Sequence, residues 1–147
     1  MSKIESFKDL IVYPVKCDFC FRWEVLFKSI LFHRVNQKAY KLAMEILEIS
    51  KKFPKEEQYS LTDQIRRSSR SVTSCIGESW ARRRYIKSFV NKLVDALGEE
   101  NETEVWLDYS FDCKYIDKES QIKLLSGYDE VRKMLISLIN NPEKWCI

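Results

Sequence analysis

Apolar residues recur every three or four positions through most of this chain, and this spacing restricts the fold more than any other feature of the sequence. The pattern is clearest over residues 117–141, where one stripe contains Leu124, Tyr128, Val131, Leu135 and Leu138. A helix of 3.6 residues per turn places such residues on one face, whereas a strand alternates with a period of two. We therefore predict a helix that begins after Asp117, its N-cap, and ends near Pro142.

Three further segments show the same helical spacing. Residues 36–53 have a stripe made of Ala39, Leu42, Ala43, Ile46 and Ile49. The segment after Ser60 has a stripe that combines apolar residues with two serines: Leu61, Ile65, Ser68, Val72, Cys75, Ile76 and Ser79. The segment 85–116 contains no proline, and its stripe runs through Ile86, Phe89, Val90, Leu93 and Leu97, thins over 98–104, and resumes at Val105, Trp106, Tyr109 and Phe111. We predict one helix for each segment.

Turn-forming residues are scarce in this sequence. Its 147 residues include only three glycines and three prolines, whereas a β-sandwich or barrel needs many turns. The length is that of one ordinary domain, so we treat residues 1–147 as a single unit. Pro54 disfavours the helical conformation at Phe53 and separates the first two predicted helices. The predicted fold is all-α, an antiparallel up-down four-helix bundle.

The segment before the first of these helices is rich in aromatic residues. Its apolar positions between 19 and 35 fit neither period cleanly, and we predict a helix that runs on into the next one. Arg22, Glu24 and Lys28 interrupt it, which excludes a bilayer span. The first ten residues are too polar for a signal peptide. We therefore expect a cytoplasmic protein with reduced cysteines.

Charge is distributed unevenly along the chain. Residues 64–92 contain eight basic side chains and one acidic one, whereas residues 95–119 contain nine acids and two lysines. Such a separation is typical of complementary helices or subunit contacts, and less often of a nucleic-acid site. A helical hairpin that turns near Arg83 would bring its arginines close to its acids. We therefore predict ion pairs, within or between subunits, among Arg66, Arg67, Arg70, Glu99, Glu100, Glu102 and Glu104.

Three consecutive arginines lie at the expected tip of this hairpin, where no acid is close in sequence. A solvated turn is one interpretation of this tip, and phosphate binding is the other. The candidate nucleic-acid residues are Arg70, Arg82, Arg83, Arg84 and Lys87. Trp80 and Tyr85 flank the tip and have two possible roles, as core residues or as rings that stack on bases.

Metal and catalytic motifs are incomplete. Cys17, Cys20 and His33 have the spacing of the first three ligands of a zinc finger, but the fourth ligand would fall at residues 37–39, which contain no histidine or cysteine. The chain has one histidine and no glycine-rich phosphate loop. We predict no metal site, no cofactor and no catalytic residue, and therefore no enzyme.

Four motifs resemble those of a known protein family. They are FKDLIVY at 7–13, QKAYKLAMEI at 37–46, KKFPKEEQYSLTDQIRRSSRSV at 51–72 and ALGEENETEVWLDYSFDCKYI at 96–116. With them the chain resembles the bacterial four-helix-bundle proteins encoded within intervening sequences of 23S ribosomal RNA genes. The resemblance implies assembly into rings, typically pentamers. It also implies kinship with the accessory subunit of diversity-generating retroelements, a basic bundle that binds a reverse transcriptase and nucleic acid.

The sequence departs from that family over residues 14–36. In the family the first motif runs almost directly into the second, whereas here about two dozen residues separate them. We interpret the segment as an insertion that lengthens the first helix or adds an arm, or as the relic of a misassembled reading frame. The functional hypothesis is a non-enzymatic RNA-binding or ribonucleoprotein-assembly module. The alternative is a structural or protein-binding oligomer with no nucleic-acid role.

Overall fold

The computed structural model describes the backbone of residues 19–146 and the side chains of residues 32–146. The described chain contains four α-helices, two short 3-10 helices and no strand. These elements are α1 (Phe19–Ser50), η2 (Lys55–Glu57), α2 (Leu61–Ala81), α3 (Ile86–Asp112), α4 (Lys118–Asn140) and η3 (Pro142–Lys144). The prediction of an all-α fold is confirmed.

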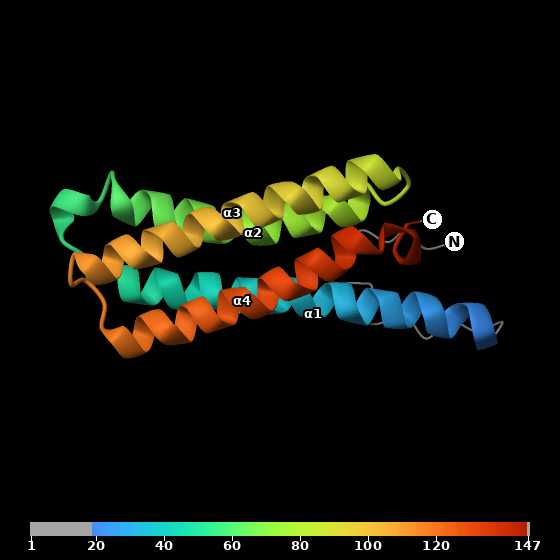
Figure 1. Ribbon diagram of the computed structural model, residues 1–147, viewed down its shortest axis with the longest axis horizontal. Coiled ribbons are helices and arrows are strands. Elements are labelled where there is room, and N and C mark those ends of the chain that lie inside the picture. The colour runs from blue at the N-terminus through green and yellow to red at the C-terminus, as the bar shows by residue number, and fades with distance from the viewer. Residues whose placement is uncertain (1–18, 147) are drawn as a thin grey trace.

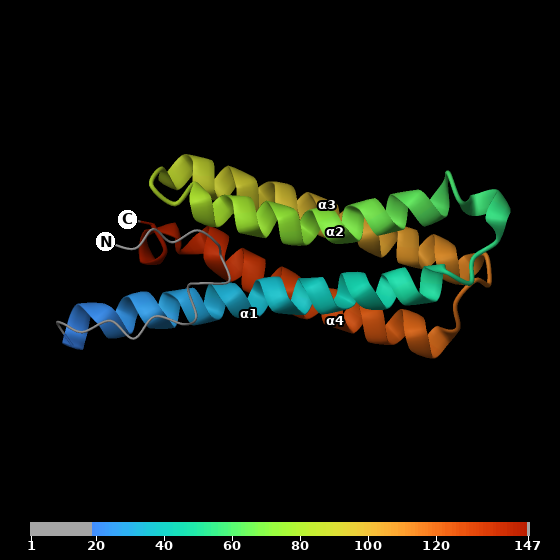
Figure 2. The ribbon, with the colours of Figure 1, turned by 180° about the vertical axis from the view of Figure 1, so that it is seen from behind.

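The four helices form a bundle of two layers (Figures 1 and 2). One layer consists of α2 and α3, and the other of α1 and α4 (Figure 2). Each helix contacts the next one along the chain, and α4 returns to contact α1. The chain reverses direction at each connection, so the α2–α3 turn and the end of α4 lie at the same end of the bundle (Figure 1). This closed arrangement buries one face of every helix.

Helix α1 is longer than the helix predicted over residues 36–53. It begins at Phe19 and continues without a break to Ser50, which confirms that the aromatic-rich segment runs on into the next helix. The beginning of α1 extends past the end of α4 (Figure 1). Residues 14–18, the first part of the predicted insertion, lie outside the described chain.

Helix α4 follows its predicted pattern closely. Asp117 is its N-cap, and the carboxylate accepts a hydrogen bond from the Ser120 amide at 2.7 Å. All five residues of the predicted stripe are buried. Gly127 lies on the same face, and a Cβ atom at this position would be 2.5 Å from Leu42 Cδ2 of α1. The missing side chain therefore lets α1 and α4 pack closely at this point.

The serine-containing stripe of α2 is also confirmed. Every residue of that stripe is buried, and Ser68 and Ser79 have no exposed surface. Thr103 of α3 donates a hydrogen bond from Oγ1 to Ser68 Oγ at 2.9 Å. Small hydroxyl side chains thus let α2 and α3 approach closely while their polar atoms remain bonded.

The second half of α3 differs from its predicted stripe. Val105 and Tyr109, expected in the core, are 51% and 54% exposed. The buried face instead starts at Phe89 and recurs at alternating intervals of four and three residues. It consists of Phe89, Leu93, Ala96, Glu100, Thr103, Leu107 and Ser110. Three polar residues interrupt the apolar sequence of this face, and for that reason the hydrophobic pattern pointed to the wrong side of the helix.

No helix in the described part of the chain combines the length and the apolar character that a bilayer span requires.

Candidate nucleic-acid interface

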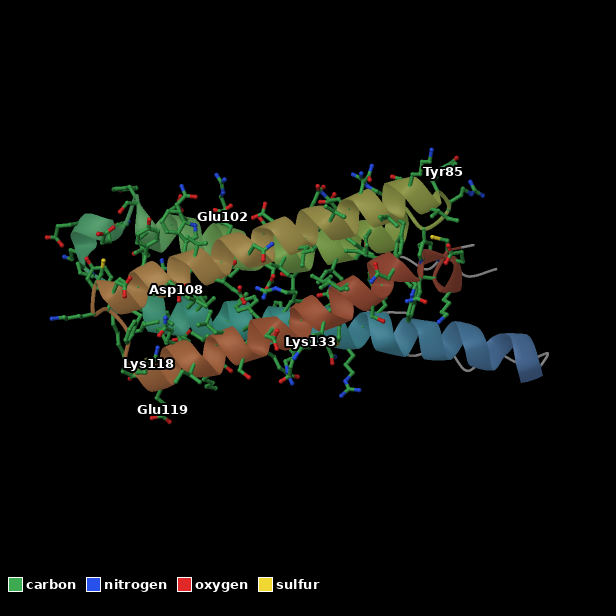
Figure 3. All side chains as sticks on the ribbon, in the orientation of Figure 1. Tyr85, Glu102, Asp108, Lys118, Glu119 and Lys133 are labelled. Carbon is green, nitrogen blue, oxygen red and sulfur yellow. The ribbon has the colours of Figure 1, made fainter. Side chains whose placement is uncertain are left out.

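The turn between α2 and α3 exposes several cations at one end of the bundle. Helix α2 ends at Ala81 and α3 begins at Ile86, so the turn itself consists of residues 82–85. The Arg82 amide donates to Ser79 O at 2.9 Å, and the Tyr85 amide donates to Arg82 O at 3.0 Å. We call residues 82–87 the cationic tip. Figure 3 labels Tyr85 at this end of the molecule.

Arg82 is held loosely at the surface of the tip. Its Nη2 atom lies 3.4 Å from Glu78 Oε2, and its side chain remains 48% exposed. The same Glu78 oxygen lies 3.2 Å from Lys92 Nζ. Lys92 Nζ also lies 3.3 Å from Asp95 Oδ2, so this group contains two cations and two carboxylates and carries no net charge.

Arg83 has a structural role. Its guanidinium lies 4.4 Å from the centre of the Trp80 ring, and Nη1 donates to Trp80 O at 3.0 Å. Burial lowers the pKa of Arg83. Trp80 also packs on Phe32, with ring centroids 4.6 Å apart. The ring of Trp80 is thus occupied by this chain, in agreement with the core role considered for it.

Arg84 and Lys87 are exposed, and neither forms an ion pair with an acid of the described residues. Lys87 lies in the first turn of α3, which contains no acid and is not capped by any side chain. The first turns of α2 and α4 contain Asp63 and Glu119, respectively. A cation at the positive end of a helix is unfavourable, and amides of the first turn lack intrahelical partners. A bound anion would relieve both costs.

Arg70 is not part of this group. It is exposed in the middle of α2, about 18 Å along the helix axis from Arg82 at 1.5 Å per residue. The structure therefore brings together Arg82, Arg84 and Lys87 of the predicted nucleic-acid residues, with Arg83 packed beneath them.

The acids of α3 have a different partner from the one predicted. Arg132 of α4 binds Glu100 with two hydrogen bonds, Nε to Oε2 at 3.1 Å and Nη2 to Oε1 at 3.0 Å. Arg132 also forms an ion pair with Glu104. The predicted pairing of these two acids with arginines of α2 is wrong, because positions 100 and 104 face α4. We call Glu100, Glu104 and Arg132 the buried charge cluster.

The remaining residues of the predicted ion-pair set make other contacts. Arg66 Nε donates to Ser50 Oγ at 2.7 Å, and Glu102 accepts a hydrogen bond from Trp106 Nε1 at 3.1 Å. Arg67 is exposed, and its charge acts to lower the pKa of Glu99, although burial raises that pKa more strongly. Whether these residues also meet another subunit stays a prediction.

The buried charge cluster carries one net negative charge when Glu100 is ionised. Glu100 has no exposed surface, and burial raises its pKa to about 7; Glu104 acts in the same direction, whereas Arg132 acts in the opposite one. Tyr128 lies nearby with its hydroxyl buried and without a hydrogen-bond partner among the described residues. A fully buried carboxylate with a single shared cation is costly in the ionised state.

The family described as 23S rRNA-intervening sequence protein matches residues 33–137. The chain belongs to this family. It is also similar to a protein of unknown function from the S23 ribosomal protein family of Bacteroides thetaiotaomicron, whose crystal structure matches with a TM-score of 0.68 and 31% sequence identity. That match covers 76% of this chain and 99% of the other. Among curated proteins, none matches this sequence.

The family match begins at residue 33, near the end of the segment predicted to be an insertion. The motif at 7–13 lies outside the matched residues and outside the described ones. The cationic tip of this intervening-sequence protein, residues 82–87, lies within the residues that the family matches.

The metal interpretation concerns residues that are only partly described. Cys17 lies outside the described chain, and the side chain of Cys20 is not described. Over residues 32–146, no three histidine, cysteine or acidic side chains lie close enough to hold a metal ion.

Sequence reasoning missed Arg132 in this intervening-sequence protein. The sequence contains one indication of it: starting at Phe89 and counting alternately four and three residues along α3 reaches Glu100, which places this acid on the buried face. A buried acid requires a cation on a facing helix. Arg132 lies next to the buried Val131 and is such a cation.

Proposed function

We propose that this intervening-sequence protein is a non-enzymatic, self-assembling bundle that binds RNA or DNA through its cationic tip. The observation that supports the proposal is the convergence of Arg82, Arg84 and Lys87 at the uncapped start of α3. Exposed cations beside unpaired helix amides form a favourable environment for phosphate groups.

One tip is small, and the net charge of the chain is only +3. A single tip would contact few phosphates and would bind weakly at physiological salt. Several copies in one particle would present several tips to the same strand, which raises the overall affinity without new contacts. The proposed function therefore depends on assembly.

The outer face of α3 supports assembly. Val94, Val105 and Tyr109 are all about half exposed, and they lie on one side of the helix. An apolar stripe of this kind on a small protein is typical of a surface that another subunit covers. We propose that copies of this chain cover it, and the family resemblance implies five subunits.

Removal of the exposed cations should abolish nucleic-acid binding. We expect the triple variant Arg82→Gln, Arg84→Gln, Lys87→Gln to lose at least about tenfold in affinity for RNA at low salt, since each contact with phosphate releases a counterion. The slope of log affinity against log salt should fall by about 0.7 for each cation lost. Fluorescence anisotropy with labelled RNA across a salt series measures both quantities.

A matched control removes the same charge at the other end of the bundle. Lys51→Gln, Lys52→Gln and Lys55→Gln lie at the α1–α2 connection, opposite the tip (Figure 1). This variant should bind as the wild type does. Equal losses in both triple variants would contradict a site at the tip. If the wild type binds no RNA or DNA even at low salt, the alternative is favoured, an oligomer that serves a structural role or binds a protein such as a reverse transcriptase.

Assembly has its own test. Light scattering should give a particle mass that is a multiple of 17.6 kDa, and Val105→Glu should reduce it because a charge would be buried in the α3 contact. Ile122→Glu, at an exposed isoleucine of α4, is the control and should leave the mass unchanged. A monomeric wild type would contradict the proposal, and an unchanged mass for Val105→Glu would exclude this face of α3.

A further inference from the structure

Tyr85 is the aromatic residue of the cationic tip. It is 67% exposed and occupies the N-cap position of α3 with an extended backbone. Its neighbours are Arg84 before it and Lys87 one half-turn after it, both exposed. An exposed aromatic ring beside exposed cations is the combination that binds single-stranded nucleic acid, since bases stack on the ring while phosphates meet the cations.

Trp80 and Tyr85, the two aromatic residues considered for base stacking, differ in whether another side chain covers the ring. Trp80 lies between Phe32 and the guanidinium of Arg83, so this chain already occupies its ring. Tyr85 projects at the end of the bundle, away from the helices (Figure 3). Only Tyr85 is therefore placed to stack on a base.

We propose that the cationic tip selects single-stranded nucleic acid over duplex, with one unpaired base stacked on Tyr85. The neighbouring phosphate binds at the start of α3, between Arg84 and Lys87. This inference rests on the proposed nucleic-acid function and adds to it the class of strand that is recognised.

The chemistry of the two forms of nucleic acid distinguishes them. In a duplex both faces of each base are covered by neighbouring base pairs, so a protein ring can stack only after a base has been unstacked. Bases of loops, bulges and single strands have a free face, and stacking on an aromatic side chain stabilises them by about 1–3 kcal/mol for each base. The cations bind phosphates of either form. The ring alone provides the selectivity.

Substitution of Tyr85 tests the inference. We expect Tyr85→Ala, which removes the ring without adding a capping hydroxyl, to weaken binding of an unstructured single strand of about 12 nucleotides by roughly 5-fold to 100-fold. Its affinity for a duplex of the same length should change less than about twofold, and its salt slope should match that of the wild type, because no cation has been removed. Tyr85→Phe keeps the ring and should bind both forms as the wild type does.

A second tyrosine provides the control. Tyr40 of α1 is 59% exposed outside the tip, and Tyr40→Ala should affect the binding of neither form. Equal binding of strand and duplex by the wild type would overturn the inference, as would a loss of affinity in Tyr85→Ala that is absent or the same for both forms. The nucleic-acid function would survive these results if the cation variant still lost binding. A wild type that binds neither form would overturn both proposals.

Discussion

Replacing Arg132 with methionine should lower the free energy of unfolding by about 3–5 kcal/mol at pH 8. The guanidinium makes two hydrogen bonds to Glu100, which has no exposed surface, and it also pairs with Glu104. Without it, two carboxylates one turn apart on α3 would lie at the contact with α4 with no cation between them. Protonation of Glu100 would remove its buried charge. The decrease in the free energy of unfolding should therefore be smaller at pH 5.

The neighbouring lysine is a matched control for this variant. Lys133 is 72% exposed and pairs at 2.6 Å with Asp129, which is itself 45% exposed. Lys133→Met makes the same change of charge one position along α4. We expect it to lower the free energy of unfolding by less than about 1 kcal/mol. Urea denaturation at one fixed protein concentration measures both variants. Similar losses for the two would show that Arg132 does not neutralise a buried charge.

The contribution of Glu100 to the stability of the wild type should fall as pH rises from the ordinary pKa of a glutamate, 4.5, to about 7. The folded protein holds a proton on Glu100 over this range because burial raises the pKa of that carboxyl, whereas the unfolded chain has released it. The folded state therefore binds more protons than the unfolded state. The stabilisation is complete below pH 4.5 and is lost as pH passes through about 7, and it amounts to no more than about 3 kcal/mol.

Glu100→Gln isolates this effect, because the amide has nearly the same shape and does not titrate. The difference in unfolding free energy between wild type and variant should change by about 2–3 kcal/mol between pH 5 and pH 8. The other groups around the site, namely Glu104, Arg132, Tyr128 and Glu45 of α1, are present in both proteins. A difference that is constant across this range would contradict a buried, titrating Glu100.

The apolar spacing predicted most of the fold. The stripes of α2 and α4 consist of apolar or small residues at helical intervals, so the buried face followed directly from the sequence. In α3 the same method failed after Ala96, because Glu100, Thr103 and Ser110 occupy core positions while Val105 and Tyr109 face outward. A hydrophobic pattern cannot identify a buried polar residue whose hydrogen bonds are made by a neighbouring helix.

The candidate site was predictable only in part. The cluster of arginines at a hairpin turn was visible in the sequence, and so was the presence of two aromatic residues beside it. Three consecutive arginines have three different directions on a helical turn, and only packing decides which of them is buried. Here Arg83 lies over Trp80, whereas Arg84 and Tyr85 remain exposed.

The sequence by itself determined that this protein is a bundle of four long helices, because local hydrophobic periodicity and a shortage of turn residues depend on no distant contact. Only the tertiary structure decided which charges neutralise one another. Glu100 and Arg132 are 32 residues apart along the chain, and their pairing depends on which face of α3 meets α4. Coulombic interactions follow distance in space, and that distance is set by how the helices pack.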